Sequence, residues 1–140
     1  MKVKCKYNTG AGFSEYTLLH MGCSAYSRLP MNVGDVYLVY GQMIANGILK
    51  YLVQGAGENF PSWYPAEIFE VIDSQMHFES YFCYRKDEEI SAVWGFRELV
   101  EDENYLYDLI EREKYAIKIF LDRKKEIEEF LNVEFDKSLR

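Results

Sequence analysis

Apolar and polar residues alternate at the start of the chain. Val3, Cys5 and Tyr7 are separated by single lysines, and this period of two predicts a half-buried strand over residues 2–7. The Asn- and Gly-containing stretch at 8–12 predicts a loop, because these residues supply backbone conformations that strands do not use. We expect an extended segment over 13–19 and a loop over 20–30, where no clear period exists.

The middle of the chain predicts two hairpins. Asn46-Gly47 lies between apolar runs at 36–40 and 48–53, and both residues tolerate the positive φ that a type I′ turn needs. A turn at 32–35 precedes the first of these runs, and a loop at 55–61 follows the second. Residues 62–67 are then expected to form an extended entry with one helical turn from Pro65, followed by a strand at 69–72. The second predicted hairpin pairs 77–84 with 90–94 through a link at 85–89.

From residue 101 onwards the hydrophobic pattern changes its period. Apolar residues now recur at spacings of three, four and seven, which is the pattern of one helix face. They are Tyr105, Leu106, Leu109, Ile110, Ala116, Ile117, Phe120, Leu121, Ile127, Phe130 and Leu131. This pattern predicts one helix over about 102–131, or two helices with a break at 112–114. Acidic residues at its start suit the positive end of the helix dipole.

Together these elements predict an α+β fold in one domain over residues 1–140. The β-rich part covers 1–100 and is expected to be a small antiparallel barrel or a strongly bent sheet. The helical C-terminal segment covers 101–135. With 140 residues, 49% of them hydrophobic, the chain can bury a substantial core. It has 12 Tyr, 9 Phe and 2 Trp, more than such a core needs, so we expect some aromatic rings at the surface as partner contacts.

Charge narrows the possible partners. The formal net charge is −7, whereas a nucleic-acid binder needs clustered Lys and Arg to neutralise phosphates. We therefore expect no nucleic-acid partner. The acidity fits either a basic protein partner or simple solubility.

The first residues and the cysteines indicate the compartment. Three cysteines without a Cys-x-x-Cys pair predict neither a disulfide framework nor a zinc knuckle: Cys5, Cys23 and Cys83. The basic start lacks the apolar run of a signal peptide, and the longest mostly apolar uncharged stretch, 36–49, is too short to span a bilayer. We expect a cytoplasmic protein with no membrane partner.

The motifs that could carry catalysis or bind a cofactor are incomplete. Gly-Ala-Gly at 10–12 and at 55–57 lacks the third glycine and the helix of a dinucleotide fingerprint. His20 with Cys23, and His77 with Cys83, lack the close four-ligand spacing of a zinc site. We therefore expect no metal, no cofactor and no enzyme. A Cys–His pair that meets only in space stays open as an alternative.

Two groups of residues are candidates for partner binding. The first is acidic, with no Lys or Arg before Arg112: Glu101, Asp102, Glu103, Asp108 and Glu111. Such a group can steer a basic partner, although a capped and solvated helix start explains it equally simply. The second is the aromatic pair Trp63 and Tyr64, expected in a loop beside Glu58. Aromatic loop residues can anchor interfaces, and a Trp next to Pro can also fill a core.

Two short segments resemble SH3-like small barrels: Val33–Val39, where a strand follows a Gly-containing turn, and Trp63–Ile72, where a Pro-led helical turn precedes the last strand. The likeness covers about residues 1–73. The continuation, at 92–100 and 109–113, looks like a group of small bacterial proteins. Proteins of this kind are similar to the immunity partners of polymorphic and contact-dependent toxins. The resemblance implies a class of function and assigns no binding residue.

Three functions are therefore weighed. The first is an immunity protein that binds and neutralises a cognate bacterial toxin, such as a basic nuclease. The second is an SH3-like adaptor that binds a peptide in a groove containing Tyr37, Trp63 and Tyr64. The third is a small enzyme with a dispersed site around His20 or His77. The sequence leaves the oligomeric state open.

Overall fold

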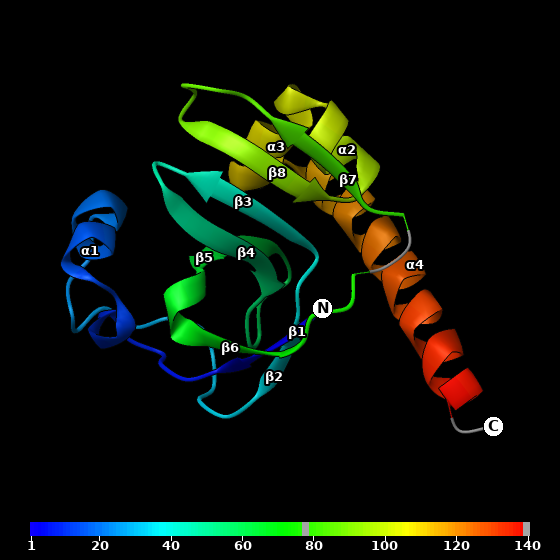
Figure 1. The fold of residues 1–140 in the computed structure, drawn as a ribbon, viewed down its shortest axis with the longest axis horizontal. Coiled ribbons are helices and arrows are strands. Elements are labelled where there is room, and N and C mark those ends of the chain that lie inside the picture. The colour runs from blue at the N-terminus through cyan, green and yellow to red at the C-terminus, as the bar shows by residue number, and fades with distance from the viewer. Residues whose placement is uncertain (77–78, 139–140) are drawn as a thin grey trace.

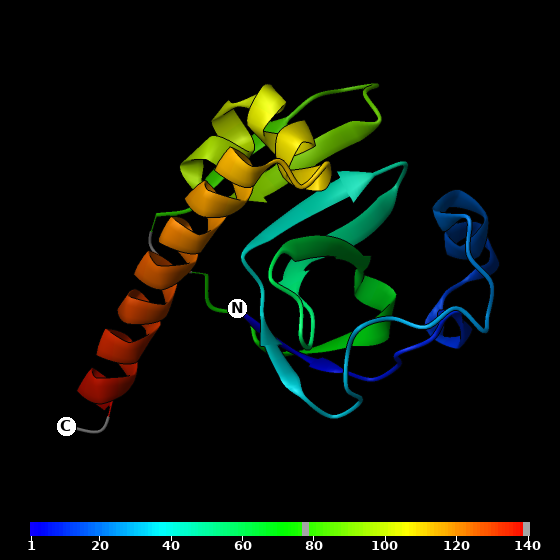
Figure 2. The same cartoon turned by 180° about the vertical axis from the view of Figure 1, so that it is seen from behind.

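The fold consists of two antiparallel sheets and four α-helices (Figures 1 and 2). The computed structural model describes residues 1–76 and 79–138, with side chains in the last helix described up to Leu131. The α+β class predicted from the sequence is confirmed. No helix in these described ranges is both long enough and apolar enough to cross a membrane.

The strands are distributed between a three-stranded sheet, in the order β2-β1-β6, and a five-stranded sheet, in the order β5-β4-β3-β8-β7. The described strands thus form two sheets and close no single barrel. Their bounds are β1 (Lys2–Cys5), β2 (Val36–Leu38), β3 (Gly41–Ala45), β4 (Ile48–Gln54), β5 (Pro61–Pro65), β6 (Phe69–Asp73), β7 (Tyr81–Tyr84) and β8 (Ile90–Gly95). Short 3-10 turns lie at η1 (Gly10–Gly12) and η2 (Ala66–Ile68).

Two hairpins are present, and the turn of the first is at the predicted position, although its first strand is β3 and not the run at 36–40. Asn46 and Gly47 have φ values of 51° and 76° and join β3 to β4, so the type I′ turn chemistry is used as expected. The β7–β8 hairpin turns with Asp87 at φ 65°. The first two residues expected in that hairpin, 77 and 78, lie outside the described residues.

The strand expected at 36–40 ends earlier than predicted, and a second strand, β3, follows it. Between them the chain crosses from one sheet to the other: the Val39 N–H donates to Met1 O at 3.1 Å, and the Tyr40 N–H donates to Leu52 O at 2.9 Å. Residues 36–45 form one mostly apolar run in the sequence, so the local pattern did not show where the chain changes sheets.

The extended segment expected over 13–19 is wrong: residues Glu15–Met21 form helix α1. Ser14 caps the helix, since its Oγ accepts from the Thr17 N–H at 3.2 Å, and Gly22 ends it in the left-handed region at φ 64°. Glu67 then holds the helix start, because one of its carboxylate oxygens accepts from the Thr17 hydroxyl at 2.6 Å. Capping chemistry and one tertiary contact therefore outweigh a weak local pattern.

Of the two alternatives for the helical third, the structure has two helices with a break between them. Helix α3 (Glu103–Ile110) ends before Arg112, whose φ of 60° reverses the chain into α4 (Lys114–Ser138). The structure adds one element that the sequence analysis assigned to the β-rich part, the short helix α2 (Arg97–Glu101). Asp102 separates it from α3 and caps α3 by accepting from the Tyr105 N–H at 3.1 Å.

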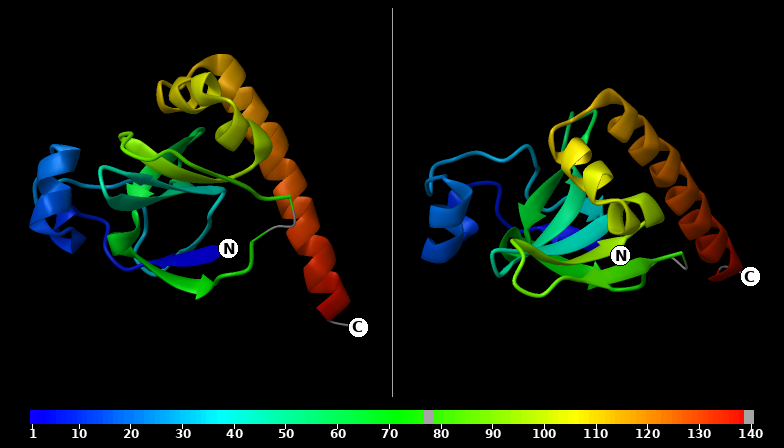
Figure 3. Two further views of the ribbon diagram at one scale, coloured as in Figure 1. Left: turned by 45° about the horizontal axis from the view of Figure 1, so that its top comes forward. Right: turned by 90° about the horizontal axis from the view of Figure 1, so that it is seen from above.

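Two apolar cores hold these layers together. The first lies between one face of the five-stranded sheet and helices α2–α4, with Leu52, Tyr105 and Phe120 almost fully buried. Figure 3 shows these helices gathered beside β8. The second lies between the two sheets and contains Val3, which is also fully buried. Tyr105, Leu106 and Leu109 of α3 and Ala116 and Phe120 of α4 face the first core, whereas Ile110 and Leu121 of the predicted apolar stripe are exposed.

Candidate functional site

A groove with a volume of about 770 Å³ lies between β7, α2 and α4. We call it the acidic groove. Apolar rings and an isoleucine form one part of its lining, and charged side chains form the other. The lining residues are Glu79, Tyr81, Phe96, Arg97, Glu98, Arg123, Glu126, Ile127, Glu129 and Phe130.

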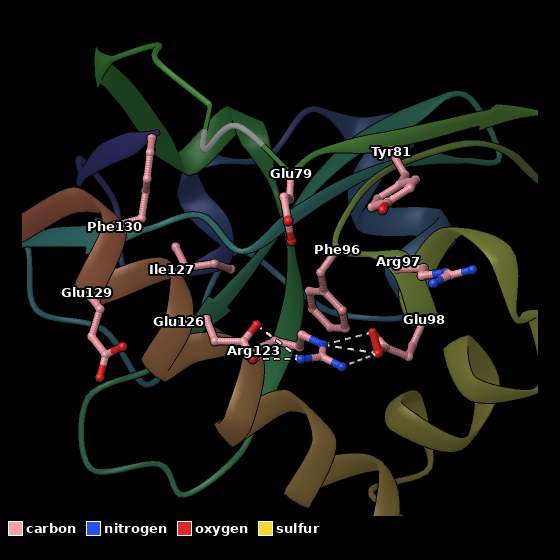
Figure 4. Close-up of a pocket in the computed structure, with 10 residues that line it drawn as sticks. All are labelled: Glu79, Tyr81, Phe96, Arg97, Glu98, Arg123, Glu126, Ile127, Glu129 and Phe130. Carbon is pink, nitrogen blue, oxygen red and sulfur yellow. Dashed lines mark hydrogen bonds and ion pairs between the residues drawn. The ribbon is translucent and has the colours of Figure 1, made fainter. Parts of the chain in front are cut away.

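Arg123 lies at the centre of the acidic groove, between Glu98 of α2 and Glu126 of α4 (Figure 4). Its Nη2 approaches one Glu98 oxygen at 2.6 Å, and its Nε donates to both Glu98 oxygens at 3.0 Å. Its Nη1 reaches the two Glu126 oxygens at 2.9 and 3.0 Å. This bidentate geometry fastens α4 to α2, so the groove is pre-formed.

The ion pairs shift the titration of both partners. Hydrogen bonding from Arg123 is the largest cause that holds the pKa of Glu98 below its usual value, and burial opposes it. The same hydrogen bond raises the pKa of Arg123 above its usual value. Both groups are therefore charged at neutral pH, and the guanidinium is already satisfied by carboxylates.

The acidic groove keeps a surplus of negative charge. Four glutamates line it against two arginines. Arg97 is also engaged, because its Nε donates to Glu101 at 2.8 Å. The carboxylates of Glu79 and Glu129 thus stand beside an apolar lining with no arginine of the groove left over for them. Such a surface suits a basic side chain of another protein, or a basic side chain next to an aromatic one.

A second cavity, of about 420 Å³, brings together members of both groups predicted from the sequence. It lies between β3–β5 and the end of α3, and Trp63 and Glu111 both line it. Burial lowers the pKa of Lys50 in its wall, and Glu89 opposes this effect. Among the buried polar side-chain atoms of the described residues, the Trp63 indole nitrogen has no hydrogen-bond partner.

The two predicted aromatic residues are separated from each other and from Glu58. Trp63 and Tyr64 are in strand β5, not in a loop, and successive residues of a strand point to opposite faces. Trp63 therefore packs against the first core, whereas Tyr64 is 8% exposed and belongs to the second. Glu58 stays in the β4–β5 loop, where its carbonyl accepts from Gln54 at 2.8 Å.

The predicted acidic residues are clustered in sequence, and several are locally engaged. Glu101 pairs with Arg97, Asp102 caps α3, and Glu103 approaches Arg85 at 3.6 Å. Asp108 accepts a hydrogen bond from the Tyr115 hydroxyl. These contacts offset part of the charge of the helix start, and the surplus carboxylates of the acidic groove lie on α4 and before β7 instead.

The sequence analysis missed the residues that build the acidic groove. The spacing of Arg97 and Glu101, and of Arg123 and Glu126, is the i,i+4 and i,i+3 pattern of helical ion pairs and could have been noticed. The contact between Glu98 and Arg123 joins positions 25 residues apart, so no local signal reveals it.

The candidate metal and thiol residues form no site within the described parts of the chain. No group of three or more His, Cys, Asp and Glu is placed there to hold a metal ion. His20 is exposed and stacks on Tyr16, with ring centroids 4.0 Å apart. The histidine of the second candidate pair, His77, lies outside the described residues, and the three cysteines are free thiols.

Comparison of the chain with known protein families, with curated proteins and with solved structures finds no match.

Proposed function

We propose that this chain is a non-enzymatic protein-binding protein of the bacterial cytoplasm. Its role would be that of an immunity protein, which binds and neutralises a cognate toxin with a basic surface. A nuclease is the class of toxin that its acidity fits best. The acidic groove is the single feature on which this proposal rests.

Three properties of the acidic groove support this role. It is concave and partly apolar, so a partner side chain can be desolvated there. Its walls are held in place by Arg123, so little order has to be created on binding. Its surplus carboxylates belong to a chain of net charge −7, whose field accelerates the approach of a cationic partner.

The proposal is tested with the catalytic domain of the basic toxin encoded beside this gene. Co-expression is expected to protect cells, and binding is expected to have an association rate that falls as salt concentration rises. The groove variant replaces Glu126 and Glu129 with Lys. We expect its association rate with the toxin to fall at least about tenfold at low ionic strength, with a weaker salt dependence.

A matched control makes the same change of net charge at a surface outside the acidic groove. Glu70 in β6 and Glu88 in the β7–β8 turn are both exposed, and their replacement by Lys should slow association much less. Equal effects of the two double variants would contradict a role for the groove. Absence of both binding and protection would refute the immunity function.

A second candidate, the SH3-like adaptor, is favoured by the topology of the first half. In residues 1–73, β1 pairs with both β2 and β6, and the 3-10 turn η2 directly precedes β6. This order supports an SH3-like relationship for that half. The peptide groove expected from Tyr37, Trp63 and Tyr64 is less well supported, because Trp63 and Tyr64 belong to different cores. If Trp63→Ala abolishes the binding of a Pro-rich peptide, the adaptor is the better description.

A further inference from the structure

Strand β7 is an unprotected edge of the five-stranded sheet. The opposite edge, β5, begins and ends with proline, which cannot donate a ladder hydrogen bond and so blocks a further strand. In contrast, β7 has the sequence Tyr-Phe-Cys-Tyr, with no proline, lysine or bulge. Natural sheets usually protect such an edge, so an open aromatic one indicates an interaction surface.

The pairing with β8 shows which backbone groups of β7 are open. The Arg85 N–H donates to Ser91 O at 2.7 Å, so Arg85 faces β8. Because the direction alternates along an antiparallel strand, Cys83 and Tyr81 also face β8. Phe82 and Tyr84 therefore turn their N–H and C=O groups away from the sheet, where an additional strand can bond to them.

The side chains of these two residues add an apolar surface. Phe82 is 54% exposed and Tyr84 is 65% exposed. Phe82 lies against Trp94, its cross-strand neighbour, with ring centroids 4.7 Å apart. The Phe82 ring is therefore held in place on one side and open on the other, as expected of an interface anchor.

Charge indicates that the added strand is β7 of a second copy. A two-fold axis perpendicular to the sheet makes the two strands antiparallel and keeps each face continuous. With Phe82 opposite Phe82 of the second copy, Glu79 lies opposite Arg85 of that copy, and the reverse pair is placed in the same way. Arg85 also approaches Glu103 of its own chain at 3.6 Å, so in the dimer it would lie between two carboxylates. Moving the axis to Cys83 would instead place Glu79 opposite Asp87, a repulsive pair.

We propose that two copies of this chain associate through β7, with Phe82 at the two-fold axis and reciprocal Glu79–Arg85 ion pairs. The two five-stranded sheets then become one continuous sheet. This inference goes beyond the immunity function because it concerns a different partner, although Glu79 and Tyr81 border both the β7 edge and the acidic groove. The strand is short, so the dimer is expected to be a concentration-dependent equilibrium, measurable between roughly 1 µM and 1 mM.

The charge pairs allow a selective experiment by sedimentation equilibrium. Glu79→Arg places four arginines at the interface, and Arg85→Glu places four glutamates there, so each variant alone should dimerise at least about tenfold more weakly than the wild type. Mixed in equal amounts, the two variants carry opposite charges at both pairs. The mixture is expected to form a heterodimer at wild-type strength or above.

Three further measurements make the result decisive. Lys125→Glu, on an exposed position of α4, should leave dimerisation unchanged. Phe82→Lys should abolish it. Hydrogen exchange at the Phe82 and Tyr84 amides should slow as protein concentration rises, without a comparable change at Tyr81 and Cys83. A wild-type chain that stays monomeric at about 1 mM, or variants that do not recover on mixing, would overturn the proposal.

Discussion

The ion pair between Glu98 and Arg123 offers the sharpest test of how α4 is held to the rest of the fold. The two side chains are 24% and 34% exposed, between the surface and the interior. Fully exposed pairs contribute about 0.2–1 kcal/mol, and hydrogen bonds to charged groups about 1.5–3 kcal/mol. From this bidentate, partly screened contact we expect a coupling free energy of about 1.5 kcal/mol.

A double-mutant cycle with Glu98→Gln and Arg123→Met isolates that coupling. Unfolding by urea, followed by tryptophan fluorescence, gives the four free energies of unfolding. For a chain of 140 residues, about 1 kcal/mol corresponds to a shift of about 3 °C in Tm, so Glu98→Gln should lower Tm by roughly 5 °C. Glu101→Gln is the matched control, because its pair with Arg97 is 51–69% exposed and should change Tm by no more than about 2 °C.

The pH dependence of stability tests the same ion pair in a second way. The folded-state pKa of Glu98 lies below its ordinary value of 4.5, so its contribution is fully present above about pH 4.5 and is lost as pH falls through the lower folded value. The stability difference between wild type and Glu98→Gln should therefore shrink in acid and vanish below the folded pKa. A coupling energy near zero, or a difference that grows in acid, refutes the reasoning.

Three other predictions concern single side chains. Phe120 is fully buried, so Phe120→Ala should lower the free energy of unfolding by about 3–5 kcal/mol in the same urea titration, and a loss under 1 kcal/mol would contradict its place in the core. Asp102 caps α3, so Asp102→Ala should cost about 0.5–2 kcal/mol, whereas Asp102→Asn should retain most of the cap; equal losses would argue against capping. The hydrogen bond to Asp108 raises the pKa of Tyr115 to about 12, and an ultraviolet titration should detect a phenol whose pKa falls in Asp108→Asn; an unchanged titration curve would remove that contact.

The experiments on function and on self-association can fail separately. The toxin experiment tests the carboxylates of α4, and the sedimentation experiment tests the edge of β7. Glu79 borders both surfaces, since it lines the acidic groove and precedes β7. For that reason the groove variant leaves Glu79 unchanged, and a loss of toxin binding cannot arise from a lost dimer contact at this residue.

The sequence by itself determined the elements whose signal is local. Asn46-Gly47 fixes a hairpin turn because its two residues accept positive φ, and the periodicity of 101–131 predicts helical structure because an apolar stripe must be buried, while leaving open whether it is one helix or two. The same pattern placed the break of the two-helix alternative near Arg112. The α+β class follows from these elements, since most strands precede the helices of the last third of the chain, with α1 as the exception.

Only the tertiary structure decided which residues far apart in the sequence are in contact. Helix α1 has local caps in Ser14 and Gly22, but its contact with Glu67, 50 residues beyond Thr17, lies outside any window around residues 13–19. Likewise the acidic groove exists because Arg123 meets Glu98 across 25 residues, and Trp63 separates from Tyr64 because a strand turns neighbours to opposite faces. Backbone preference acts over a few residues, whereas charge pairing and burial act through space, so the sequence alone predicts elements better than it predicts sites.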